Sequence, residues 1–250
     1  MRIQIVVAAH KLYPMPRDPV YLPVQAGRAL HEPLGFTGDN SGENISAKNP
    51  YYCELTCLFW AWKNLDADAL GLCHYRRYFK GRLFGSKWER ILTGEQVEKL
   101  LSKVPAVLPK KRNYYIETGW SQYAHAHHEE DLIAVRAILE AQYPAYVPAF
   151  DRTLGRTKGH RFNMFIMRRE ALDDYCTWLF GVLAELEAKL DISEYSSNDQ
   201  RVFGFVAERL LDVWIETEGV PYCECPVIHM ESQHWLKKGS AFLKRKFAAK

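Results

Sequence analysis

Histidine, tyrosine and arginine side chains directly follow an apolar run in the first third of the chain. Residues 71–79 read GLCHYRRYF, so the apolar run gives way to His74, Tyr75, Arg76 and Arg77. A buried strand does not tolerate two adjacent arginines, whereas an exposed loop does not need the apolar lead-in. The pattern therefore predicts a strand that leaves the core and opens into a pocket at its carboxyl end.

Two adjacent guanidinium groups favour an anionic ligand. Each guanidinium is a forked donor that matches the oxygens of a phosphate group, and the neighbouring tyrosines can stack on a base or a sugar. The alternative is that Arg76 and Arg77 form salt bridges with acidic side chains of the protein. We favour the anionic ligand for at least one of the two.

Asp66 and Asp68 form an Asp-x-Asp pair, an arrangement that holds a divalent metal in many nucleotide-sugar transferases. The pair precedes the strand expected over residues 69–74 instead of following it. It should therefore lie in a helix-to-strand turn, at the opposite edge of the sheet from a ligand crevice. We expect no metal ligand here, and cationic side chains would then neutralise a departing diphosphate.

Two further stretches carry polar groups suited to binding. HAHHEEDL, residues 125–132, could bring His127 or His128 together with Asp131 at the start of a helix, for acid/base work or substrate binding. A zinc site needs more ligands than this stretch can bring to one face. DNSGENISAKN, residues 39–49, suits recognition of hydroxyl groups or a uracil edge, and equally the capping of a helix.

The chain contains no GxxxxGK[ST], GxGxxG or GxSxG motif. These absences argue against P-loop phosphotransfer, common dinucleotide dehydrogenases and ordinary α/β-hydrolases. The formal net charge of +3 is too weak to indicate nucleic-acid binding. Neither a secretory signal nor an apolar stretch of membrane-spanning length is present, so we expect a cytoplasmic protein.

Apolar runs alternate with helical periodicity along the chain. The strands are expected over residues 2–9, 69–74, 104–108, 162–167 and 225–230, and the helices over residues 51–64, 95–103, 129–142, 170–189 and 198–216. This alternation predicts an α/β fold with a mostly parallel central sheet flanked by helices. Ligands bind outside the carboxyl ends of such strands, and His10, His74, Asn163 and His229 all lie in or near those positions.

The last residues differ from the rest of the chain. HWLKKGSAFLKRKFAAK is basic and interleaved with apolar side chains, as in a segment that lies on an anionic membrane surface. An ordinary solvated terminus is the alternative. We therefore expect one domain over residues 1–234 and a basic amphipathic tail over residues 235–250.

Several motifs resemble one bacterial family. AAHK, GDNSGENISAKNPYYCELTCLFWAWKN, GLCHYRRYF, HHEEDL, FNMFIM, YCTWLF and FGFVAERLL carry the resemblance, which covers nearly the whole chain. That family is long filed as a domain of unknown function and is found in capsule, exopolysaccharide and lipopolysaccharide gene clusters. Its members are regarded as glycosyltransferases, some of them galactofuranosyltransferases. The resemblance implies a GT-A-like fold.

The resemblance also implies a reaction, the transfer of a sugar, with galactofuranose as the candidate, from a UDP-sugar to a growing surface polysaccharide. The acceptor would be lipid-linked and the enzyme would touch the inner membrane peripherally. In glycogenin-like relatives an Asp-x-Asp strand end occupies the place of His74–Arg77, so a divalent metal is not expected as a cofactor here. Met164 and Phe165 replace small residues of those relatives, and retaining or inverting chemistry stays open.

Residue roles follow from the resemblance together with the polar patterns. The donor-binding candidates are Ala8, His10, Lys11, Asp39, Asn40, Asn44, Ser46, Asn49, Tyr75, Arg76 and Arg77. The candidates near the sugar or acceptor are His127, His128, Asn163 and Met164, and those for the catalytic base are His74, Asp131 and Asp199. Two other functions stay open: a sugar-phosphate or nucleotidyl transferase, and a non-catalytic glycan- or nucleotide-binding module.

Overall fold

The computed structural model describes residues 1–231 and contains a nine-stranded central sheet. Its strands are β1 (Ile3–Ala9), β2 (Tyr21–Gln25), β3 (Thr37–Gly38), β4 (Ala69–His74), β5 (Arg77–Phe79), β6 (Ala106–Pro109), β9 (Phe165–Arg168), β10 (Tyr222–Cys225) and β11 (Val227–His229). The order is β10-β6-β9-β4-β1-β2-β3, with β5 paired to β4 and β11 paired to β5. The short strands β7 (Arg112–Asn113) and β8 (Lys158–Gly159) form a separate pair.

Most neighbours along the main path of the sheet run parallel, and β9 is the exception. The β10-β6, β4-β1, β1-β2 and β2-β3 pairings are parallel, whereas β9 is antiparallel to both β4 and β6. The prediction of an α/β fold with a mostly parallel central sheet and flanking helices is therefore confirmed. Because β9 is reversed, the residues that precede it meet the residues that end β4.

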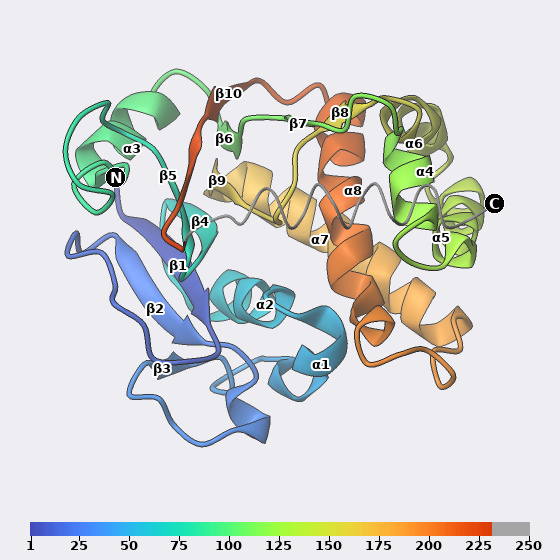
Figure 1. Cartoon of the computed structure of the whole chain (residues 1–250), viewed down its shortest axis with the longest axis horizontal. Coiled ribbons are helices and arrows are strands. Elements are labelled where there is room, and N and C mark those ends of the chain that lie inside the picture. The colour runs from blue at the N-terminus through green and yellow to red at the C-terminus, as the bar shows by residue number, and fades with distance from the viewer. Residues whose placement is uncertain (232–250) are drawn as a thin grey trace.

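Helices cover the sheet unequally (Figure 1). They are α1 (Asn49–Tyr52), α2 (Leu55–Asn64), α3 (Gly94–Leu101), α4 (Gly119–Ala124), α5 (Glu129–Gln142), α6 (Val147–Leu154), α7 (Arg169–Lys189) and α8 (Val202–Thr217). One buried cluster joins α2 and α4–α8 to the sheet, and a second joins α3 and β5 to the opposite face. None of the helices in residues 1–231 is both long and apolar enough to cross a membrane.

The first strand shows why both faces of the sheet are covered. Val6 and Ala8 point into the cluster that contains α2 and α8, whereas Ile5 and Val7 point into the cluster that contains α3. Alternate residues of a strand face opposite sides, so a strand buried on both sides reads as one continuous apolar run. This burial fixes the position of His10, which directly follows the strand.

Some element boundaries differ from the sequence predictions. The helix expected over residues 51–64 is interrupted at Cys53, whose φ of 52° ends α1 before α2 begins. The strand expected over residues 162–167 begins only at Phe165, because Phe162 and Asn163 adopt φ values of 81° and 50°. The basic tail predicted over residues 235–250 lies outside the described residues.

Several elements of the structure were not predicted, namely the strands β2, β3, β5, β7, β8 and β10 and the helices α4 and α6. Pro23 lies in the middle of β2, which argues against a central strand. The structure accommodates it because β3 pairs only with Val24 and Gln25, so β2 is an edge strand at Pro23.

Candidate functional site

A cleft of about 640 Å³ opens at the carboxyl ends of β1 and β4. A cleft of this size accommodates a ligand as large as a nucleotide sugar. Its lining residues are Ala8, Ala9, His10, Ala26, Asn49, Pro50, Cys53, Glu54, His74, Tyr75, Arg76, Arg77, Arg112, Tyr114, Arg161, Phe162, Arg201, Phe205 and Glu208. Several of the predicted donor-binding residues therefore line one cavity, namely Ala8, His10, Asn49, Tyr75, Arg76 and Arg77.

The cleft is strongly cationic. Its lining includes five arginines but only two glutamates, and the arginines come from four separate segments of the chain. Burial and the positive charges of Arg76, Lys11 and Arg201 lower the pKa of His10. So many cations around one cavity favour binding of a polyanion.

Arg77 is the most informative of these arginines. Burial, together with the adjacent Arg76, lowers its pKa, and its buried Nε atom has no hydrogen-bond partner in the described structure. Its guanidinium lies over the Phe162 ring, 4.6 Å from the ring centre. By contrast, Arg76 is half-exposed and lies 3.5 Å from a carboxylate oxygen of Glu231. Arg76 therefore has a partly exposed acidic neighbour that leaves some of its donors free, whereas Arg77 has a buried donor without a partner in the described structure.

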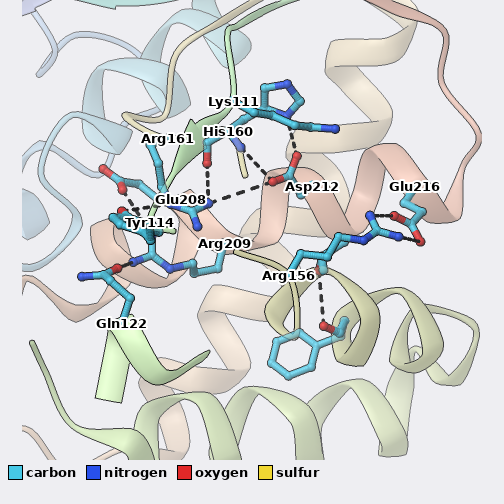
Figure 2. Close-up of polar contacts among 12 residues, drawn as sticks. Lys111, Tyr114, Gln122, Arg156, His160, Arg161, Glu208, Arg209, Asp212 and Glu216 are labelled. Atoms are coloured by element: carbon cyan, nitrogen blue, oxygen red, sulfur yellow. Dashed lines mark hydrogen bonds and ion pairs between the residues drawn. The ribbon is translucent and has the colours of Figure 1, made fainter. Parts of the chain in front are cut away.

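A buried polar network supports Arg161 from behind (Figure 2). Arg161 donates from Nε to the Tyr114 hydroxyl at 3.3 Å and from Nη1 to the His160 carbonyl at 2.6 Å. The fully buried His160 in turn contacts Asp212 through both its backbone N–H and Nδ1. Burial alone would raise the pKa of Asp212, but the hydrogen bonds and charge of His160 hold it below its ordinary value. The network fixes one cationic wall of the cleft.

The reversed strand β9 links His74 to the cleft floor. His74 Nε2 lies 2.5 Å from the Phe162 carbonyl oxygen and 3.8 Å from Glu54 Oε1. Asn163 donates from Nδ2 to Glu54 Oε1 at 2.8 Å and to the Gly204 carbonyl at 3.0 Å. Desolvation lowers the pKa of His74, so the neutral imidazole is favoured in this setting. Asn163 is buried beneath the cleft, and its side chain holds the Glu54 carboxylate by a hydrogen bond.

Helix α8 contributes one face to the cleft. Arg201 is the N-cap of α8, and Phe205 and Glu208 follow it at spacings of four and three residues, so all three lie on one side of the helix. Arg201 donates from Nε to Cys53 Sγ at 3.2 Å, and its guanidinium lies 5.1 Å from the centre of the Phe205 ring. This spacing was visible in the sequence, but an apolar helix with three such residues predicts core packing equally well.

The loop predicted to bind the donor mostly stabilises itself. Buried Asp39 accepts hydrogen bonds from the backbone N–H groups of Gly27 and Arg28, each at 2.9 Å, and from the Ser46 hydroxyl. Asn44 accepts from the Ser46 backbone at 3.2 Å. Asn40 is exposed, and of the five predicted loop residues only Asn49 lines the cleft.

Replacing Asp39 by Ala is expected to lower the free energy of unfolding by roughly 2–4 kcal/mol, because three donors lose a buried charged acceptor. Urea unfolding followed by circular dichroism measures the loss. Asn40→Ala, in the same loop but exposed, should change stability by less than about 0.5 kcal/mol. Equal stability of the two variants would show that Asp39 does not hold the loop.

His127 and His128 lie near Asp131, as predicted, but within residues 1–231 neither imidazole forms a hydrogen bond or ion pair with it. Asp131 instead accepts hydrogen bonds from the hydroxyls of Tyr123 and Tyr195, both at 2.8 Å, while His127 Nδ1 lies 3.2 Å from Asp199. His128 Nε2 lies 3.9 Å from the same carboxylate of Asp199. Burial raises the pKa of Asp131, whereas hydrogen bonds from Ser196 and His127 lower that of Asp199.

This histidine cluster packs against the outside of the cleft wall. The His127 ring stacks on Phe205 with centroids 4.1 Å apart, and Phe205 lines the cleft. Neither Asp131 nor Asp199 is among the lining residues. Met164 is fully buried in the core behind the cleft, and Lys11 lies near the rim, 5.3 Å above the Tyr75 ring.

The Asp-x-Asp pair lies away from the cleft, as expected. Arg2 precedes β1 and donates to both carboxylate oxygens of Asp66, while its backbone N–H donates to Asp68 at 2.7 Å. Both aspartates precede β4, at the amino edge of the parallel strands. Within residues 1–231 there is no group of three or more histidine, cysteine, aspartate or glutamate side chains placed to hold a metal ion.

The structure thus combines an α/β sheet with an arginine-rich cleft at the carboxyl ends of its parallel strands. The chain belongs to the family described as a domain of unknown function, DUF4422, which it matches over residues 4–219. It is also similar to a solved structure, the apo form of the bifunctional glycosyltransferase WbbM, with 29% identity and a TM-score of 0.86. That similarity covers 93% of this chain and 46% of the WbbM chain, so this chain spans less than half of that protein. A comparison with curated proteins gave no match.

Proposed function

We propose that this protein is a glycosyltransferase that uses a nucleoside diphosphate sugar as its donor. The observation that carries the proposal is the arginine-lined cleft at the carboxyl ends of β1 and β4. The similarity to the glycosyltransferase WbbM supports the same class of reaction. Arg76 and Arg77 bind the diphosphate, and His10 and Asn49 hold the nucleoside beside them. Ala8 lets the donor approach β1 closely.

The departing diphosphate is neutralised by arginines in this proposal. The cleft has five guanidinium groups where an Asp-x-Asp site would supply carboxylates for a metal, and both of its glutamates lie among these arginines. A fixed cation stabilises developing phosphate charge without any rearrangement at the moment of reaction. Transfer should therefore proceed without a divalent metal ion.

Glu208 is our proposed catalytic base. It lines the cleft from α8, and its Oε2 atom lies 3.4 Å from Arg209 Nη1. Glu54, the other carboxylate of the cleft, is already engaged by Asn163 at 2.8 Å. Asp131 has both oxygens engaged by tyrosines, and Asp199 lies behind Phe205, so Glu208 is better placed than either to reach an acceptor hydroxyl.

The sugar and the acceptor are proposed from the family resemblance described above. The donor is a UDP-sugar with galactofuranose as the candidate, and the acceptor is a lipid-linked surface polysaccharide of the capsule, exopolysaccharide or O-antigen type. The protein would work in the cytoplasm at the inner face of the membrane. His127 and His128 lie just outside the Phe205 wall, where a growing glycan can reach them.

A thermal-shift screen of UDP-, GDP-, CMP- and dTDP-sugars, with and without EDTA, tests the donor class. We expect a UDP-sugar to raise the melting temperature and the rise to persist in EDTA, because arginines supply the charge. A rise that EDTA abolishes would overturn the metal-independent part of the proposal. A product that carries the transferred phosphate would indicate a sugar-phosphate or nucleotidyl transferase, and sugar binding without UDP release would indicate a binding module.

A further inference from the structure

The loop between β5 and α3 presents large apolar side chains to solvent. Phe84 is 86% exposed, the highest value among the large apolar residues of the described chain, and Leu83 is 73% exposed. Trp88, four residues on, is 38% exposed. Three neighbouring side chains of this size seldom face water in a protein without a binding surface there.

Hydrogen bonds within residues 80–91 give this loop a defined conformation. Lys80 pairs with Ile91 at the base, and the backbone N–H of Gly81 donates to the Arg90 carbonyl at 2.8 Å. At the tip, Ser86 and Glu89 exchange hydrogen bonds between backbone and side chain, at 2.7 and 3.4 Å. These contacts hold the chain on both sides of Leu83 and Phe84, whose side chains face solvent.

The loop carries more positive than negative charge. Residues 80–91 include Lys80, Arg82, Lys87 and Arg90, whereas Glu89 is the single acidic residue. Its carboxylate already accepts a hydrogen bond from the Ser86 backbone. Charged residues are depleted from the centres of protein–protein interfaces, but cations beside aromatic and aliphatic side chains are typical of segments that lie in an anionic lipid surface.

The loop also lies beside the point where the described chain stops. Lys87 Nζ donates to the carbonyl oxygens of His229 at 2.8 Å and Met230 at 3.0 Å. The next residue, Glu231, contacts Arg76 at the cleft. In the sequence, the later segment 235–250 has the same basic and apolar composition as this loop.

We propose that residues 80–91 dock the protein onto an anionic phospholipid bilayer. Leu83 and Phe84 enter the boundary between headgroups and acyl chains, and Trp88 lies at headgroup level. Arg82 and its cationic neighbours contact the lipid phosphates.

Flotation of the full chain with phospholipid vesicles tests this surface. Vesicles of phosphatidylcholine with phosphatidylglycerol should bind the wild type, and the Leu83→Ser/Phe84→Ser double variant should bind at least about tenfold more weakly. The tail is present in both proteins, so the difference reports the loop. Arg82→Gln should weaken binding to these vesicles and leave binding to pure phosphatidylcholine unchanged.

Ile133→Ser is the matched control, since Ile133 on α5 is 54% exposed and lies outside the loop. Ile133→Ser should bind vesicles like the wild type, and all variants should have the melting temperature of the wild type. Wild-type binding by the double variant, or no binding by the wild type, would overturn the proposal. Loss of self-association in the double variant without any vesicle binding would assign the loop to a protein contact instead. The readout needs no sugar donor, so it is independent of the proposed reaction.

Discussion

Replacing Glu208 by Gln is expected to lower the turnover of sugar transfer by about 100-fold to 10,000-fold while donor binding stays nearly unchanged. Glutamine keeps an oxygen that can accept from Arg209 but cannot take a proton from an acceptor hydroxyl. Steady-state kinetics of UDP release, with the dissociation constant of UDP measured separately, would show a large fall in kcat without matching loss of affinity.

Two further variants define this result. Glu216→Gln changes a carboxylate on the same helix that is paired with Arg152 and Arg156, and it should leave turnover unchanged. Glu54→Gln removes the other carboxylate of the cleft. If Glu208→Gln retains turnover and Glu54→Gln loses it, the base is Glu54, and if both retain turnover, neither glutamate acts as the base.

Replacing Arg77 by Ala is expected to weaken binding of UDP by about tenfold to 100-fold, equivalent to roughly 1–3 kcal/mol. The buried Nε of Arg77 has no hydrogen-bond partner in the described structure, so a bound phosphate would use a donor that is otherwise unused. Isothermal titration calorimetry measures the change. Arg76→Ala should have a smaller effect, because its guanidinium is half-exposed and lies close to Glu231.

The stability of Arg77→Ala separates binding from folding. Burial and the neighbouring positive charge of Arg76 both disfavour the charged guanidinium, as its lowered pKa indicates. Removing it should therefore not lower the melting temperature of the unliganded protein. Arg136→Ala, which removes an arginine from α5 outside the cleft, should leave UDP affinity unchanged. Unaltered UDP affinity in Arg77→Ala would exclude Arg77 from the diphosphate site.

The local sequence pattern by itself predicted those strands and helices whose apolar residues repeat with a clear period. Apolar runs of strand length gave β1 and β4, and helical periodicity gave α5 and α7 close to their observed bounds. Because polar residues directly follow two parallel buried strands, the sequence also placed His10 and the HYRR motif at one edge of the sheet. The position of Asp66 and Asp68 at the other edge follows from the same reasoning.

Only the tertiary structure decided which distant residues complete the cleft. The direction of β9 depends on pairing with β4 and β6, which strand periodicity does not encode, and that direction brings Phe162 to His74. Likewise, the α8 face that carries Glu208 reads as an amphipathic helix until the packing of the helix shows what it faces. Asp131 shows the converse: a carboxylate in a suggestive motif is committed to two tyrosines that lie 8 and 64 residues away along the chain. Burial and partners, which set whether a charged group is available for chemistry, are properties of the packed chain.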